Sequence, residues 1–117
     1  MNLNLALDRH AQWKTNLRAA IFAQSTVDEA TLSKDDCCDL GKWLYGEGKE
    51  KLSHLTGFTE AVSKHAEFHR EVGKVARVIN DKKFAEAEAM LGTGTSYANA
   101  SNAIGVAIMR LKKEANL

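Results

Sequence analysis

Two histidines in the middle of the chain have the spacing of metal ligands. His65 and His69 lie four residues apart in a stretch whose other residues at that helical register are apolar. Residues four apart on a helix share one face, with Cβ atoms about 5–6 Å apart, so both imidazoles can reach one metal ion. His10 has a similar inward position between Leu7 and Trp13. A buried imidazole without a partner costs on the order of 1–3 kcal/mol, and a shared metal ion removes that cost. The pattern therefore favours a metal site that uses three histidines.

A cysteine can complete this site. The chain has two cysteines, Cys37 and Cys38, adjacent in sequence. A disulfide between neighbours is strained and closes no useful loop, so a thiol that matters here is expected to be a metal ligand or a redox centre. Zinc prefers four ligands in a tetrahedron, drawn from histidine nitrogen and cysteine sulfur. Spacing alone leaves open which cysteine is the fourth ligand and whether the three histidines converge.

The N-terminal half predicts one long helix and one short one. We expect the first helix to run from about Leu3 to Gln24. Its inward face is marked by residues at steps of three and four, namely Leu3, Leu7, His10, Trp13, Leu17 and Ile21. The stretch Ser25–Leu32 is typical of a connection. A short second helix should follow Ser33, whose hydroxyl can cap it, and should end near Tyr45, before Gly46 and Gly48.

The C-terminal half predicts a long helix and a broken one. The third helix carries an uninterrupted seam at steps of three and four, made of Leu55, Phe58, Val62, His65, His69, Val72, Ala76 and Ile79. A turn at Asn80 precedes a short helix at about Lys82–Leu91, residues 92–94 break the pattern, and a last helix begins at about Ser96. We therefore expect an all-α fold, an antiparallel four-helix-type bundle with a short second helix and a broken fourth helix.

Composition sets limits on the class of protein. The 117 residues are 44% hydrophobic and contain no proline and eight glycines, so we expect a single helical domain over residues 1–117. A net charge of +1 gives no case for nucleic acid. No apolar run approaches the roughly 20 residues that span a bilayer, and Asp8 and Arg9 interrupt any signal-peptide core. We expect a cytoplasmic chain without membrane contact.

Three segments together resemble a known family. Residues 38–43 read C-D-L-G-K-W, which matches the C-x-L-G-x-W motif of the chemoreceptor zinc-binding (CZB) domain. Residues 10–13 resemble its H-x-x-W element, and residues 65–69 resemble its paired histidines. The resemblance implies one zinc ion per chain, bound by four ligands: His10, Cys38, His65 and His69. It thus selects Cys38 over Cys37. For Gly41 within the motif, we expect room for a close helix approach.

The resemblance also implies a function. Domains of this family are regulatory, and they occur attached to bacterial chemoreceptors and diguanylate cyclases or alone. They are thought to respond to zinc level or to oxidation of the zinc-bound thiolate, notably by hypochlorous acid, and they tend to form homodimers. We therefore expect a sensory module rather than an enzyme, dimeric, acting on the signalling domain of a chemoreceptor or diguanylate cyclase in cis or trans. Either a free-standing protein or a segment of a longer one fits the sequence.

Three other functions also use a helical bundle. A hemerythrin-like or ferritin-like di-iron bundle needs bridging carboxylates, yet Glu67 lies off the seam and no inward Glu-x-x-His occurs. A histidine phosphotransfer bundle needs an exposed histidine, whereas His65 and His69 are expected on the buried face. A metal-free helical interaction module remains an alternative. His54 has no inward register and is expected at the surface.

Overall fold

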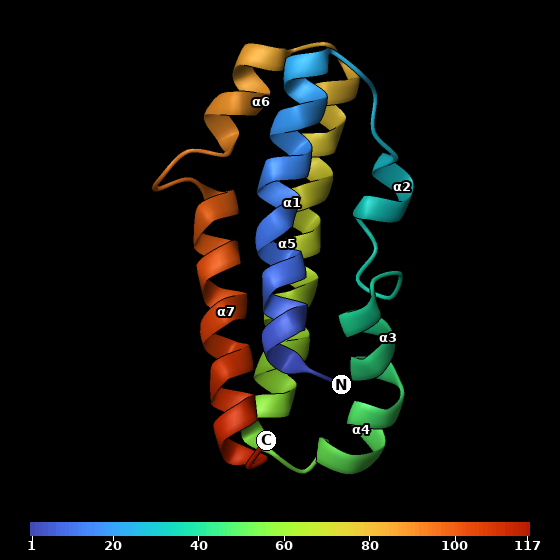
Figure 1. The fold of residues 1–117 in the computed structure, drawn as a ribbon, viewed down its shortest axis with the longest axis vertical. Coiled ribbons are helices and arrows are strands. Elements are labelled where there is room, and N and C mark those ends of the chain that lie inside the picture. The colour runs from blue at the N-terminus through green and yellow to red at the C-terminus, as the bar shows by residue number, and fades with distance from the viewer.

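The computed structural model describes residues 1–117, and its regular elements are all helices. In chain order these are α1 (Leu3–Ala23), α2 (Glu29–Leu32), α3 (Asp39–Tyr45), α4 (Glu47–Leu52), α5 (Thr56–Asn80), α6 (Phe84–Met90) and α7 (Ser96–Glu114). Figure 1 shows four columns: α1, then α2 to α4, then α5, then α6 with α7. Successive columns run in opposite directions, up and down in this view. The predicted all-α, four-helix-type bundle with a broken fourth helix is confirmed.

Helix α5 is the centre of the bundle. Most of its predicted seam is buried, while Leu55 and Val62 are half-buried. The seam packs with apolar residues from the other columns, including Leu17, Leu44, Ile104, Ile108 and Leu111. Burial of such side chains is the main stabilising contribution, about 25 cal/mol for each Å² of apolar surface removed from water. The predicted register therefore places His65 and His69 inside the core.

The second column differs from the prediction in three ways. Within the predicted connection, α2 forms because the Asp28 side chain accepts a hydrogen bond from the Thr31 amide and caps its N-terminus. The next helix, α3, begins at Asp39 rather than after Ser33, because Cys38 is its N-cap and is extended (φ −83°, ψ 162°). Helical structure also continues past Gly46, which separates α3 from α4 with φ −113° and ψ −111°. The column is therefore a chain of three short helices.

Specific contacts hold this column to α5 at its upper end in Figure 1. The Asn80 side chain accepts a hydrogen bond from the Val27 amide (2.8 Å) and donates one to the Val27 carbonyl (2.9 Å). Farther along α5, Gly73 leaves room for Ser33, whose Cβ would lie 2.7 Å from a Cβ at position 73. These contacts fix the position along α5 at which the loop after Ser33 lies.

Gly41 has a different role from the one predicted. A Cβ at this position would lie 1.8 Å from the carbonyl oxygen of Asp35, which belongs to the turn before α3 and not to a neighbouring helix. The expected close approach of another helix is therefore wrong. The absence of a side chain lets the turn fold tightly against α3, and this positions Cys38 between them.

No helix of this fold combines the length and the apolar character that a bilayer crossing requires.

Candidate metal centre

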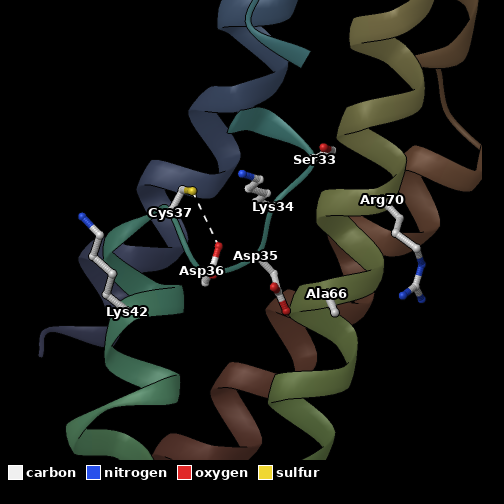
Figure 2. Close-up of a pocket in the computed structure, with 8 residues that line it drawn as sticks. All are labelled: Ser33, Lys34, Asp35, Asp36, Cys37, Lys42, Ala66 and Arg70. Carbon is white, nitrogen blue, oxygen red and sulfur yellow. Dashed lines mark hydrogen bonds between the residues drawn. The ribbon is translucent and has the colours of Figure 1, made fainter. Parts of the chain in front are cut away.

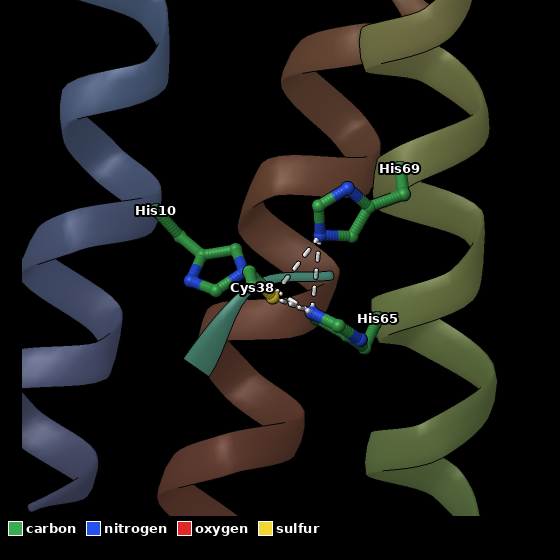
Figure 3. Close-up of side chains that lie close together, drawn as sticks. All are labelled: His10, Cys38, His65 and His69. Atoms are coloured by element: carbon green, nitrogen blue, oxygen red, sulfur yellow. Dashed lines mark hydrogen bonds between the residues drawn. The ribbon is translucent and has the colours of Figure 1, made fainter. Parts of the chain in front are cut away.

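Four side chains from three parts of the fold meet in the core (Figure 3). His10 comes from α1, Cys38 from the turn before α3, and His65 and His69 from successive turns of α5. The three histidines are at most 5% exposed, and Cys38 is half-buried. One nitrogen of each histidine and the sulfur all lie within 4.8 Å of one another. The convergence that spacing could not establish is thus present.

The separations match a tetrahedral zinc site. The Nε2 atom of His65 lies 3.2 Å from that of His10 and 3.1 Å from that of His69. The Cys38 sulfur lies 3.2, 3.5 and 3.9 Å from the Nε2 atoms of His65, His69 and His10, respectively. Zinc bonds to nitrogen and sulfur at tetrahedral angles place two nitrogens about 3.3 Å apart, and a nitrogen and a sulfur about 3.6 Å apart. The donor set and its geometry therefore fit zinc.

Two of the histidines are oriented by backbone carbonyls. The Nδ1–H of His10 donates to the Ala6 carbonyl at 2.8 Å, and that of His69 donates to the Leu32 carbonyl at 2.9 Å. Each bond places the proton on Nδ1, so the lone pair of Nε2 faces the cluster. Histidines that bind metals commonly have such a partner on the other ring nitrogen. The Ala6 and Leu32 carbonyls could not have been found from residue types, because every residue carries one.

His65 lacks the backbone partner that orients the other two histidines. Its Nδ1 atom is buried and has no hydrogen-bond partner. Burial, followed by the proximity of His69 and His10, lowers the pKa of His65 to about 3. Burial also lowers the pKa of His10, against a smaller opposite effect of its bond to Ala6. Both imidazoles are therefore neutral at neutral pH, which is the form that binds metals.

Cys38 caps the helix that it precedes. Its sulfur accepts a hydrogen bond from the Gly41 amide at 3.3 Å. Burial raises the pKa of the Cys38 thiol, and the amides of Gly41 and Leu40 act in the opposite direction. A metal ion bound at this sulfur would favour the thiolate much more strongly than these amides do.

Aromatic side chains surround the cluster. The ring of Phe68 lies 5.4 Å from that of His10 and 5.6 Å from that of His69, centroid to centroid. The centroid of the Trp13 ring lies 6.3 Å from that of His69. Trp13, which the sequence places on the inward face of the first helix, thus packs against a candidate ligand. These rings restrict the orientations of the imidazoles.

The other cysteine and the other histidine lie outside the cluster. Cys37 is exposed, and its thiol donates to the Asp36 carboxylate at 3.6 Å (Figure 2). His54 is exposed, as predicted. No carboxylate belongs to the cluster. The bridging acids of a di-iron site therefore have no counterpart here.

A helical bundle with three histidines and one cysteine in its core defines a class of zinc-binding helical module. The family model described as the chemoreceptor zinc-binding domain matches residues 10–76, more than half of the chain. The chain belongs to this family. It therefore binds zinc, and its family is sensory rather than catalytic. Comparisons with curated proteins and with solved structures give no match.

Proposed function

We propose that this protein is a zinc-dependent sensory domain of bacterial signalling, in which His10, Cys38, His65 and His69 bind one zinc ion per chain. The observation that carries the proposal is the approach of one sulfur and three Nε2 atoms to tetrahedral separations in the core. Four protein ligands make a closed site, which leaves no position for a reactive water. This donor set favours sensing over catalytic turnover.

The signal is a change at Cys38, either oxidation of its sulfur or loss of zinc. Bound zinc keeps the sulfur in the thiolate form, which oxidants attack. The thiolate attacks the chlorine of hypochlorous acid, so an S–Cl bond forms, the Cl–O bond breaks and hydroxide leaves. Water then replaces the chloride on sulfur, and the hydroxide takes up the proton that this step releases. The overall step converts one thiolate and one hypochlorous acid into one sulfenic acid and one chloride ion. Sulfur is oxidised by two electrons and chlorine is reduced by two.

The structural response follows from the position of Cys38. Oxidised sulfur is a poorer ligand than thiolate, so Cys38 separates from the three histidines. Among the four proposed ligands, Cys38 alone comes from the second column, and α3 after it has only seven residues. A helix this short depends on its tertiary contacts. The segment Lys34–Tyr45 therefore loses order, while α1 and α5 stay in place.

The proposed context is that of the family. The domain forms a homodimer in the cytoplasm, where free thiols are kept reduced until an oxidant arrives. Its altered second column acts on the signalling domain of a chemoreceptor or diguanylate cyclase, in the same chain or in a partner.

Two measurements test this proposal. Metal analysis of the purified protein should find one zinc per chain; two irons would favour a hemerythrin-like bundle, and no metal a helical interaction module. Hydrogen exchange should then be compared before and after mild treatment with hypochlorous acid. Faster exchange confined to Lys34–Tyr45, with Cys38 modified, supports the switch. If Cys38 stays unmodified while other residues react, the redox mechanism is wrong and zinc level is the signal.

A further inference from the structure

A cavity beside the metal centre borders the Cys38 side chain. It has a volume of about 370 Å³ and lies between α1 and the segment 37–40. His10 and Cys38 belong to its wall, and so do Arg9, Gln12 and Asn16, which are exposed to solvent. The cavity therefore connects bulk water with two of the proposed zinc ligands.

A second hollow lies on the other side of the same segment. It has a volume of about 720 Å³, and its wall contains Cys37 but not Cys38 (Figure 2). In Figure 2, the sulfur of Cys37 lies by Asp36, and Arg70 extends away from the segment. A reagent in this hollow meets the exposed thiol first. The cavity beside α1 contains both cysteines in its wall, Cys38 as well as Cys37.

An ion pair spans this cavity next to the ligands. Arg9 and Asp39 form a salt bridge between α1 and the first turn of α3, and both residues line the cavity. Arg9 adjoins His10 in sequence, and Asp39 adjoins Cys38. The two charges compensate each other, so this pair adds no net charge to the cavity wall. Leu5 and Ala6 add apolar surface to the wall.

We propose that this cavity is the access site through which small uncharged molecules reach Cys38, and that Leu5 in its wall helps to set their maximum size. An ion would lose hydration in a partly apolar cavity, whereas a neutral molecule the size of hypochlorous acid loses much less. Larger thiol reagents reach Cys38 more slowly, because the walls restrict their approach. The assignment of hypochlorous acid as the molecule that enters the cavity rests on the proposed function. The size limit that the cavity imposes does not.

The test uses a Cys37→Ala background, so that Cys38 is the single thiol. Leu5 is half-exposed, at 46%, and can be varied without opening the core. Leu5→Trp narrows the cavity and Leu5→Ala widens it. Phe22→Ala is the matched control, because Phe22 lies on the same helix, is 93% exposed and does not line the cavity. Modification rates of Cys38 are measured by mass spectrometry with hypochlorous acid, N-ethylmaleimide and fluorescein maleimide, on zinc-loaded and zinc-free protein.

The expected result is a change in selectivity between reagents. Leu5→Trp should lower the rate at which fluorescein maleimide modifies Cys38 about tenfold, and the rate for hypochlorous acid less than about threefold. Leu5→Ala should raise the rate for fluorescein maleimide. If both Leu5 variants react with every reagent at the same rate as the Phe22→Ala control, the proposed access site is wrong. If residue 5 controls the maleimide rates but hypochlorous acid never modifies Cys38, the access site stands and the redox part of the proposed function fails.

Discussion

The Nδ1–H of His69 donates a hydrogen bond of 2.9 Å to the carbonyl of Leu32, the last residue of α2. Six residues later, Cys38 brings its sulfur to 3.5 Å from Nε2 of the same histidine. Both ends of the segment 32–38 are therefore connected to one imidazole. A change in the position of the His69 ring therefore acts on both ends of this segment.

Removal of any proposed ligand should release the metal. Replacement of His10, Cys38, His65 or His69 by alanine should weaken zinc binding by more than about 100-fold, because loss of a ligand costs more than loss of a residue that only orients one. Competition with a chromophoric chelator measures the affinity.

Cys37→Ala and His54→Ala are the controls for these variants. Both residues are exposed and lie outside the cluster, so zinc affinity should stay within about twofold of the parent. If Cys37→Ala loses zinc and Cys38→Ala keeps it, the assignment of the sulfur ligand is wrong.

Zinc should stabilise a protein that is already largely helical. The core formed by α5 and α7 contains apolar side chains that need no metal, so circular dichroism should show little loss of helix on chelation. Free zinc at about 1,000 times its dissociation constant should add about 4 kcal/mol to the free energy of unfolding. Thermal unfolding with and without chelator measures the gain. An unchanged melting temperature would mean that the folded protein does not contain an assembled site.

Gly41→Ala should be strongly destabilising. The new Cβ would overlap the Asp35 carbonyl, so the turn before α3 must move, at a cost of about 1–3 kcal/mol or more. Cys38 is in this turn, so zinc affinity should fall as well. Urea unfolding and chelator competition on the same variant measure the two effects.

Gly105→Ala is the matched control for this substitution. Gly105 lies in α7, and a Cβ there meets no atom within 4 Å. Alanine should therefore stabilise the protein by about 0.5–1 kcal/mol through helix propensity. Equal destabilisation by both substitutions would show that the Asp35 contact is not the cause.

The zinc-free protein should lose stability in mild acid. His65 has a pKa of about 3 in the fold, against an ordinary value of 6.5, and the pKa of His10 is shifted in the same direction. Below pH 6.5 the unfolded chain therefore binds protons that the folded site does not, so stability falls as the pH falls toward 3. From about pH 7 to about pH 5, His65 alone should cost on the order of 2 kcal/mol. Urea unfolding across this range measures the slope, which His65→Leu should reduce.

The sequence predicts the long helices and the cluster well, for physical reasons. The seam of α5 extends over many turns, so its inward register is unambiguous, and His65 and His69 share it. The selection of Cys38 needed the family motif, because two adjacent thiols have almost the same spacing to every histidine. Helix α2 has only four residues, too few for a periodic pattern. The Leu32 carbonyl and the Asp35 oxygen beside Gly41 are backbone atoms, which residue types do not reveal.

Sequence separations give the position of Cys38 a topological consequence. It lies 28 residues after His10 and 27 before His65, so shared coordination would divide the intervening chain into two closed loops of nearly equal length. Without the sulfur, contact between His10 and His65 closes one loop of 55 residues instead. The entropic cost of closing a loop grows only with the logarithm of its length, so the two histidines can stay together. Release of the cysteine then gives conformational freedom to the residues between α1 and α5 without separating these two helices.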